Sequence, residues 1–277
     1  MTHSNPLILY DISSPLQPRS YAPNPSKARL ALGFKQVPFT STFVEIPDIP
    51  KVRSGLDCAA TRKLGDGSDF YTLPMLRDAA ADKTIGDSFD IAHYLEDTFP
   101  ECGGCLFPKD STGNGLDYES PSMGKTWGPP ITTNEGSKHA AYARFNLHVD
   151  TTFTAHVMLV AYHMPFNRET AEATKAVFLK RANLKSWDDM MLEGEAREQV
   201  KKSFQESLTS LAQLFMVHAG GPFLEGEKAN YADLIVGGWV NMMAQTMPED
   251  EWRDFRTWHG GVWARLHDAL QVYFVCK

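Results

Sequence analysis

Two polar residues stand where a helix is expected to begin, and one of them, Ser88, could help to bind an anion there. Asp87 and Ser88 directly precede an apolar stripe at helical spacing, Ile91, Tyr94 and Leu95, so Ser88 is expected to cap this helix. Its hydroxyl and the unpaired N–H groups of the first turn would favour a carboxylate, because the positive end of the helix dipole lies there. A serine in this position is more often a plain cap, so the pattern alone leaves both interpretations open.

The pair Cys102 and Cys105 has the spacing of a redox-active or metal-binding motif. A catalytic pair beside a thioredoxin-like pattern would stand at the start of the first helix, whereas this pair follows the last helix of the N-terminal region. No second Cys or His pair with ligand spacing follows it, so a zinc site is not expected. We interpret the segment as a tight turn with two incidental thiols, and we expect no metal.

Three histidines fall in one helical stretch: His139, His148 and His156. No serine or carboxylate is placed beside them as a catalytic triad requires, so we expect packing or surface roles. The glycine turns at 65–67 and 113–115 lack the Lys-Ser/Thr context of a phosphate-binding loop. Nucleotide binding is therefore not expected.

Short apolar runs and helical patterns alternate in the N-terminal third, which predicts the order β-α-β-α-β-β-α. Asn24 is a favoured N-cap for the first helix, and Pro25 suits its first helical position. The expected strands are 7–10, 39–45, 73–77 and 83–86, and the other expected helices are a short one at 56–64 and one from Ser88 to about Phe99.

The composition changes between Phe107 and Thr133, where eight of 27 residues are Gly or Pro against 37 of 277 in the whole chain. Such a segment is long for a simple connection within a domain. We therefore predict an N-terminal domain over 1–106, a Gly/Pro-rich linker over 107–133 and an all-helical domain over 134–277.

The helical domain is expected to begin with a long helix that reaches about Met164. The further expected helical segments are 186–217, a helix after Asn230 in which Asp233 completes a capping box, 251–258 and 262–274.

Charge and apolar content exclude several classes of protein. The chain holds 27 Lys or Arg against 34 Asp or Glu, a formal charge of −7, whereas nucleic-acid binding needs a basic surface. No apolar run reaches the roughly 20 residues that a membrane helix requires, and the first residues show no secretory signal. We expect a cytoplasmic protein with reduced cysteines and neither nucleic-acid nor membrane partners.

The order of elements and one group of residues resemble the cytosolic glutathione transferases. The segment Thr72–Leu76 is similar to the strand that carries the family's cis-proline, and eleven residues after Pro74 the segment Ile85–Ser88 matches the turn that binds the glutamyl group. Asn24, followed by Lys-x-Arg-Leu-Ala-Leu, is similar to the fungal-specific class A transferases, which resemble bacterial β-etherases. The resemblance implies a thioredoxin-like N-terminal domain, a helical C-terminal domain and glutathione transferase activity.

The resemblance also implies how glutathione would be held. A cis bond before Pro74 would present the backbone N–H and C=O of Leu73 to the cysteinyl peptide of glutathione as an added strand. Ser88 would bind the γ-glutamyl carboxylate, and Asp87 would bind the ammonium in this subunit or across a dimer. Lys51, matched only by its approximate position, would hold the glycyl carboxylate.

The reacting sulfur would lie at the start of the first helix, where the helix terminus favours the thiolate over the thiol. In the family a Ser, Tyr or Cys there bonds the sulfur. Ala22 stands at the serine position here and offers only its backbone. Asn24 could supply an amide N–H together with backbone N–H groups, although a plain N-cap is equally consistent with the sequence. Tyr21 and Ser20 match the position of the family's sulfur-binding residue less well.

The second ligand site would lie between the domains. Tyr142, Phe145 and Phe153 share one face of the long helix, a pattern more often seen in a core. In the family part of this helix faces the first domain, so these residues would wall the site with Tyr21. The resemblance implies aromatic or phenolic electrophiles derived from wood, including aryl ethers, and a homodimer.

Three functions remain open at this point. Glutathione could act as the nucleophile of an enzyme, or the protein could be a ligandin that binds polyphenols, because Ala22 lacks the expected hydroxyl. A role in protein assembly or regulation ranks lowest, since the glutathione turn is intact.

Overall fold

The computed structural model describes residues 6–64, 66–108, 116, 138–218 and 220–274. Its sheet comprises β1 (Leu7–Ile12), β2 (Phe39–Val44), β5 (Met75–Asp78) and β6 (Lys83–Ile85), in the order β2-β1-β5-β6. β2 runs parallel to β1, whereas β5 and β6 are antiparallel to their neighbours. Together with α1 (Pro23–Phe34) and α3 (Ser88–Thr98), this sheet forms the expected thioredoxin-like unit.

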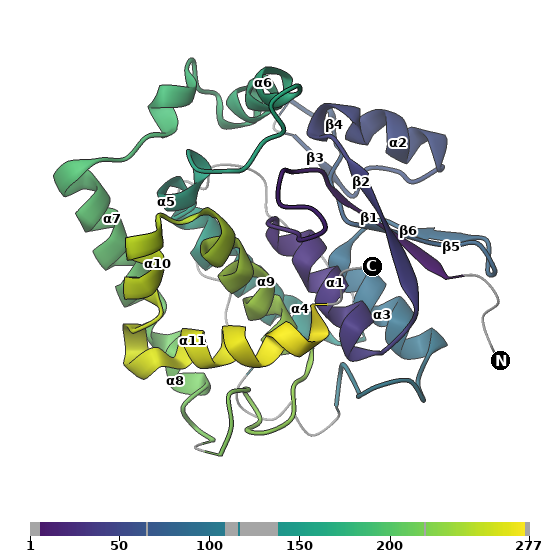
Figure 1. Cartoon of the computed structure of the whole chain (residues 1–277). Coiled ribbons are helices and arrows are strands. Elements are labelled where there is room, and N and C mark those ends of the chain that lie inside the picture. The colour runs from purple at the N-terminus through teal and green to yellow at the C-terminus, as the bar shows by residue number, and fades with distance from the viewer. Residues whose placement is uncertain (1–5, 65, 109–115, 117–137, 219, 275–277) are drawn as a thin grey trace.

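Helix α1 lies between the sheet and the helical domain (Figure 1). It packs closely on α9 (Tyr231–Thr246). A Cβ atom on Gly238 of α9 would lie 2.6 Å from the carbonyl oxygen of Pro23 and 2.7 Å from the side chain of Lys27. The missing side chain of Gly238 therefore lets the two domains meet at the start of α1.

The segment between β2 and β5 differs from the expectation of a helix over 56–64. Its elements are η1 (Ile46–Asp48), α2 (Ile49–Gly55) and a hairpin of β3 (Arg62–Lys63) with β4 (Asp69–Phe70). Pro47 and Pro50 are the second residues of η1 and α2. The N–H groups of the first helical turn have no partner within the helix, so the missing N–H of proline has no cost there, and its fixed φ suits a helix. Because of these prolines, the helix of this segment lies earlier in the chain than the apolar pattern predicts.

The helical domain consists of α4 (Ala140–Ala155), α5 (Met158–Ala161), α6 (Ala171–Ala182), η3 (Trp187–Met190), α7 (Gly194–Ser207), α8 (Thr209–Leu214), α9, α10 (Glu249–Phe255), α11 (Trp258–Leu270) and η4 (Gln271–Tyr273). The capping box of α9 is confirmed: the Asn230 side chain accepts a hydrogen bond from the N–H of Ala232, and the Asp233 carboxylate accepts one from the N–H of Asn230.

Other helix boundaries differ from the sequence prediction. The long helix ends at Ala155 rather than near Met164, and α5 follows as a separate turn. The stretch 186–217 is divided into η3, α7 and α8. Helix α6 was not expected, because Thr174 is its one buried residue and it therefore carries no apolar stripe.

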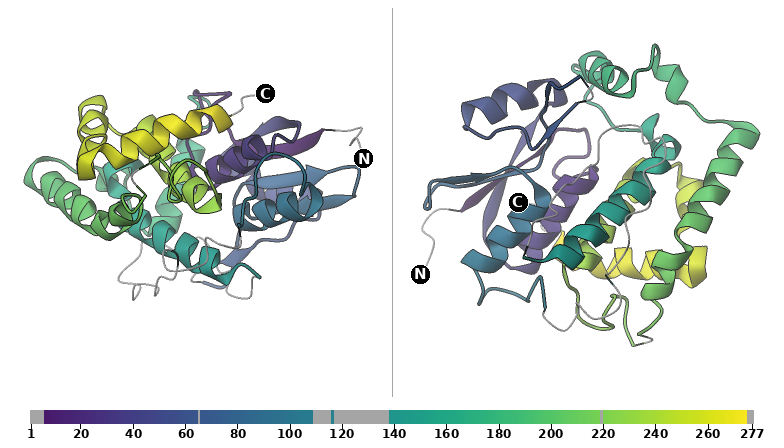
Figure 2. Two further views of the ribbon diagram at one scale, coloured as in Figure 1. Left: turned by 90° about the horizontal axis from the view of Figure 1, so that it is seen from below. Right: turned by 180° about the vertical axis from the view of Figure 1, so that it is seen from behind.

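One hydrophobic core joins the two domains. It includes Leu30 of α1, Phe89 of α3 and Ile235 of α9, and the views in Figures 1 and 2 place α7 on the side away from the sheet. Most of the predicted linker 107–133 lies outside the described residues, but Phe107 and Leu116 belong to the core. Within the described part of the chain, no helix has the length and apolar content to cross a membrane.

Candidate functional site

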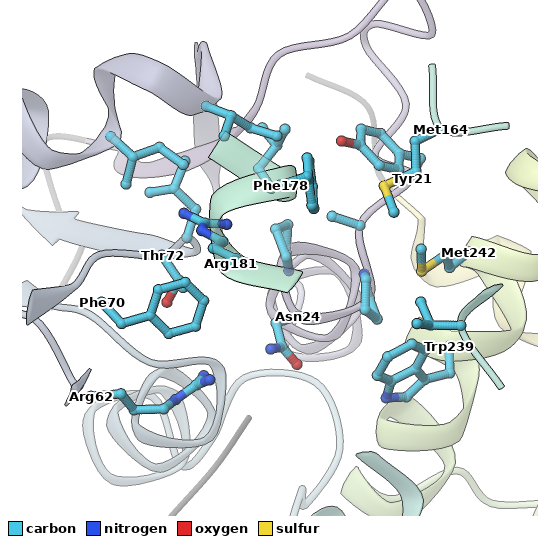
Figure 3. A pocket seen from close by; sticks show the side chains of 18 residues that line it. Tyr21, Asn24, Arg62, Phe70, Thr72, Met164, Phe178, Arg181, Trp239 and Met242 are labelled. Carbon is cyan, nitrogen blue, oxygen red and sulfur yellow. The ribbon is translucent and has the colours of Figure 1, made fainter. Parts of the chain in front are cut away.

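A pocket of about 190 Å³ opens where the start of α1 meets the helical domain (Figure 3). Its thioredoxin-like side is lined by Ile12, Tyr21, Ala22, Pro23, Asn24, Pro25, Ile46, Ile49, Arg62, Phe70, Thr72 and Leu73. The helical domain contributes Val157 and five residues that we call the aromatic wall: Met164, Phe178, Arg181, Trp239 and Met242. The lining is mainly apolar, and its polar groups are few.

The strand that leads into β5 carries the expected backbone feature. The Leu73–Pro74 peptide bond is cis, and Leu73 is buried and lines the pocket. Within the described residues, no hydrogen bond uses the backbone N–H or C=O of Leu73. These two groups are available to an extended peptide, which would add to the strand by main-chain pairing.

The turn before α3 differs from the prediction in one respect, because Asp87 and not Ser88 is the N-cap. The Asp87 carboxylate accepts a hydrogen bond of 2.8 Å from the N–H of Phe89, and Ser88 is the buried first residue of the helix. Tyr231 of α9 donates to the carbonyl of Ser88 over 3.0 Å. We refer to Thr72–Pro74 and Gly86–Ser88 together as the strand-and-turn edge.

Burial raises the pKa of Asp87, while the Phe89 N–H and the cations Arg62 and Lys27 act in the opposite direction. Two cations of the thioredoxin-like domain therefore stand near this carboxylate. An ammonium group brought to Asp87 would stabilise its charged form in the same way.

The side chain of Arg53 holds the two segments of the strand-and-turn edge together, a role that the sequence analysis did not predict. Its buried guanidinium donates to the carbonyl of Thr72 over 2.6 Å and to the carbonyl of Gly86 over 3.0 Å. A Cβ atom on Gly86 would lie 2.2 Å from the Arg53 side chain, so glycine at this position lets the guanidinium lie against the turn. The predicted residue Lys51, two positions earlier on α2, is exposed and does not line the pocket.

The start of α1 offers few hydrogen-bond donors. Ala22 is the N-cap and makes no side-chain cap bond, so the expectation that Asn24 caps the helix is wrong. Pro23 and Pro25 have no N–H, which leaves Asn24 as the backbone donor among the first three helical residues. Asn241 of α9 donates to the carbonyl of Ser20 over 2.8 Å and so holds this loop against the helical domain.

The side chain of Asn24 lies between Arg62 and Trp239 (Figure 3). Its Oδ1 atom is buried and has no hydrogen-bond partner among the described residues. Since no helix-capping bond engages this amide, it remains available to a group in the pocket.

Tyr21 lines the pocket and is buried. Burial, followed by the charges of Asp11 and Glu45, raises the pKa of its phenol. The hydroxyl therefore stays protonated at neutral pH.

The aromatic residues predicted on α4 occupy the core instead of the pocket. Tyr142, Phe145 and Phe153 are fully buried and belong to the hydrophobic core, and none of them is part of the pocket lining. Phe153 stacks on Trp239 with ring centroids 5.4 Å apart. This face of α4 therefore supports the aromatic wall from behind.

Trp239 is held by a buried polar network. Its Nε1–H donates to Asp150 over 2.6 Å, and the same carboxylate receives Lys27 of α1 at 2.5 Å. Asn146 also accepts from Lys27, over 2.8 Å. The network ties α1, α4 and α9 together directly behind the pocket.

Family models match both parts of the chain. The model described as "Glutathione S-transferase, N-terminal domain" matches residues 21–98, and "Glutathione S-transferase, C-terminal domain" matches residues 140–273. The chain belongs to the glutathione S-transferase family.

Relatives of this transferase include fungal proteins. A glutathione S-transferase of Ceriporiopsis subvermispora, CsGST63524, crystallised with glutathione, is 27% identical, with a TM-score of 0.80 and 99% of each chain covered. The glutathione S-transferase-like protein ustS of Aspergillus flavus is 24% identical, over 98% of this chain and 92% of its own.

Two further structures share the fold at lower identity. Glutathione transferase GSTFuA3 of Phanerochaete chrysosporium is 22% identical, with a TM-score of 0.77 and 99% of each chain covered. The β-etherase LigF of Sphingobium sp. is 16% identical, with a TM-score of 0.57, over 96% of this chain and 95% of its own.

The cysteines and histidines that the structure of this transferase describes do not line the pocket. Cys102 and Cys105 are exposed, and Cys105 donates to Glu96 over 3.0 Å. His139 stacks on Phe107 at 4.1 Å between ring centroids, and His156 stacks on Phe204 at 4.9 Å. Among the described residues, no group of His, Cys, Asp and Glu could hold a metal ion; Cys276 lies outside them.

Proposed function

We propose that this glutathione S-transferase uses the thiolate of glutathione to attack hydrophobic aromatic or phenolic electrophiles, including aryl ethers of the wood-derived type. The main support is the position of the α1 start. Ala22 and Asn24 line the same pocket as Leu73 and the aromatic wall. The sulfur of a glutathione paired with Leu73 would lie near Ala22 and Asn24, within reach of the ring of an aromatic ligand in the pocket.

In the proposed binding mode, the backbone N–H and C=O of Leu73 pair with the cysteinyl residue of glutathione. Ser88 and the first turn of α3 receive the γ-glutamyl carboxylate, and Asp87 receives the ammonium. Lys51 is left out, because its exposed side chain does not line the pocket. By analogy with the cytosolic transferases we also expect a homodimer in the cytoplasm.

The thiolate would be stabilised by the Asn24 amide and by the backbone N–H groups of Ala22 and Asn24. The glutathione thiol loses its proton, the sulfur forms a bond to the electrophilic carbon, and the bond from that carbon to its leaving group breaks. From an aryl ether the leaving group is a phenolate, which takes up a proton. The products are a glutathione thioether and a phenol, and no oxidant or reductant is consumed.

A second candidate function is that of a ligandin that binds polyphenols and turns over little. The donor-poor start of α1 favours it, since Ala22 has no hydroxyl and Pro23 and Pro25 have no N–H. The aromatic wall would serve a bound polyphenol as well as a substrate.

Two measurements separate the candidates. Turnover of a nitroaryl halide and of a β-aryl ether with glutathione is compared with the displacement of a fluorescent hydrophobic probe by phenols. Turnover of either substrate well above the uncatalysed rate supports the enzyme, whereas tight displacement with negligible turnover supports the ligandin. The variant Ala22→Ser should raise the rate only if the missing hydroxyl limits the chemistry.

A further inference from the structure

Two arginines from different domains reach one aromatic ring in the pocket. Arg181 of α6 places its guanidinium carbon 4.5 Å from the centroid of Phe70, and that of Arg62 in β3 lies 5.7 Å from the same centroid. Both arginines line the pocket, and Figure 3 shows their side chains beside Phe70. The hairpin β3–β4 and helix α6 thus bring two cations to one side of an otherwise apolar cavity.

Arg62 is 9% exposed and Arg181 is partly buried. The fully buried cations among the described residues are matched by acceptors. Lys27 pairs with Asp150 at 2.5 Å, Arg29 with Asp11 at 2.8 Å and Lys35 with Glu96 at 3.1 Å. Arg53 donates to backbone carbonyls. A buried cation is costly without such partners.

The pocket arginines have no comparable partner within the described residues. Neither Arg62 nor Arg181 forms an ion pair there; Arg181 has one hydrogen bond, of 3.4 Å, to the carbonyl of Tyr71. The charges of Asp87 and Asp150 act on Arg62 from beyond ion-pair distance. The groups that act on Arg181 are the phenol of Tyr21, which is neutral at pH 7, and Arg62.

Burial lowers the pKa of Arg181 to about 10. The guanidinium therefore remains charged at neutral pH, in surroundings that penalise the charge. An anion supplied by a ligand would relieve this penalty, and a guanidinium can hold a carboxylate through two parallel hydrogen bonds.

We propose that Arg181, assisted by Arg62, forms a carboxylate-binding subsite for aromatic acids, with the ring of the acid against Phe178 and Met164 of the aromatic wall. This inference rests on the proposed function, because it assumes that the pocket accepts aromatic ligands. Glutathione also carries carboxylates, so the experiment must establish which molecule supplies the anion.

The test compares 1-naphthoate with its neutral analogue 1-naphthamide by calorimetric titration. The wild-type protein should bind the acid about tenfold more tightly than the amide, or more. In Arg181→Gln this preference should fall to about threefold or less, and Arg62→Gln should reduce it in part. Lys180→Gln, which removes the neighbouring exposed charge on α6, should keep the full preference.

Glutathione is titrated with the same variants, and the naphthoate titration is repeated at saturating glutathione. A preference that persists with glutathione bound assigns the anion to the aromatic ligand. If Arg181→Gln instead weakens glutathione binding and leaves the naphthoate preference unchanged, or if glutathione abolishes naphthoate binding, the subsite is overturned.

Equal affinity of the wild-type protein for acid and amide would also overturn the subsite while leaving the aromatic pocket intact. Failure of both naphthalenes to bind would instead refute the proposed function. Arg181→Lys guards against a folding artefact, since it keeps the charge without the bidentate geometry and should retain an intermediate preference. Thermal unfolding of each variant establishes that it is folded.

Discussion

The strand-and-turn edge contributes Thr72 and Leu73 to the pocket that the aromatic wall also lines, but the two regions are built in different ways. The edge consists of short segments in which the N–H and C=O of Leu73 make no hydrogen bond among the described residues, held by one buried guanidinium. The wall consists of side chains from α6, α9 and the segment after α5. Its tryptophan is fixed from behind by the network of Lys27 and Asp150.

This difference suits the two regions to different ligands, the edge to glutathione and the wall to the aromatic ligand. A backbone edge recognises any peptide of the right length and charge, so it suits a cosubstrate that does not change. A wall of side chains can change with little effect on the sheet, so it suits a variable second ligand. Changes at the edge should therefore act on glutathione alone, and changes at the wall should act on the aromatic ligand.

The largest effect is expected from replacing Arg53, which holds the strand-and-turn edge together. Arg53→Met leaves the carbonyls of Thr72 and Gly86 without their donor, and each buried acceptor so orphaned costs about 1–3 kcal/mol. We expect a loss of at least about 3 kcal/mol in the free energy of unfolding, measured in urea, and weaker glutathione binding.

Arg77→Met on β5 is the matched control, because Arg77 pairs with the exposed Asp82 and should contribute less than about 1 kcal/mol. If the two variants lost equal stability, the bracing role of Arg53 would be wrong.

A smaller effect is expected when Ser88 is replaced by Ala. Removing a hydroxyl that bonds a buried carboxylate should weaken glutathione binding by about 1–3 kcal/mol, while the displacement of a hydrophobic probe by phenols stays unchanged. Calorimetry measures the first quantity and fluorescence the second. Ser54→Ala, exposed on α2, is the control; unchanged glutathione affinity in Ser88→Ala would contradict the assignment.

Asn24 stands where the two regions meet. Asn24→Asp places a carboxylate beside the sulfur, so the pKa of the bound glutathione thiol should rise by about one unit or more, equivalent to roughly 1.4 kcal/mol. The thiolate absorbance of the complex, followed against pH, reports this value. Asn183→Asp, at an exposed position after α6, should have no effect, and an unchanged thiol pKa in Asn24→Asp would favour the ligandin.

The smallest effect is expected at Glu45, whose hydrogen bonds link the thioredoxin-like domain to the helical domain. Glu45 accepts hydrogen bonds of 2.6 Å from both Asn167 and Thr170. Burial acts to raise the pKa of Glu45, but hydrogen bonds from Thr170, Ser13 and Asn167 outweigh it and lower the pKa below 4.5.

A lowered pKa in the folded state means that the carboxylate stabilises the fold above pH 4.5, and that this contribution is lost as the pH falls through the lowered value. Glu45→Gln should therefore cost about 0.5–1 kcal/mol at pH 7 and should flatten the stability profile between about pH 5 and 3. Urea unfolding at several pH values tests this. The exposed Glu172→Gln should keep the wild-type slope; equal slopes in all three proteins would contradict the role of Glu45.

Local signals predicted much of the fold and part of the site. The four strands of the main sheet and the capping box at Asn230 and Asp233 agree with the structure. The cis bond before Pro74, which the family resemblance implied, is also confirmed. The position of an N-cap was predicted less well where two candidate residues lie close together in the sequence. Asp87 took the cap expected of Ser88, and Ala22 took the cap expected of Asn24.

The sequence by itself determined the parts whose geometry depends on neighbouring residues, such as the strand that follows Pro74 and the turn at Asp87 and Ser88. Only the tertiary structure decided which side chains face the pocket, because that depends on how α9 packs on α1, α4 on α9 and α6 on η1. Tyr142 and its neighbours were turned into the core, while Arg181, on a helix without an apolar stripe, was brought to the ring of Phe70. Spacing along one helix carries no information about contacts between helices far apart in the chain.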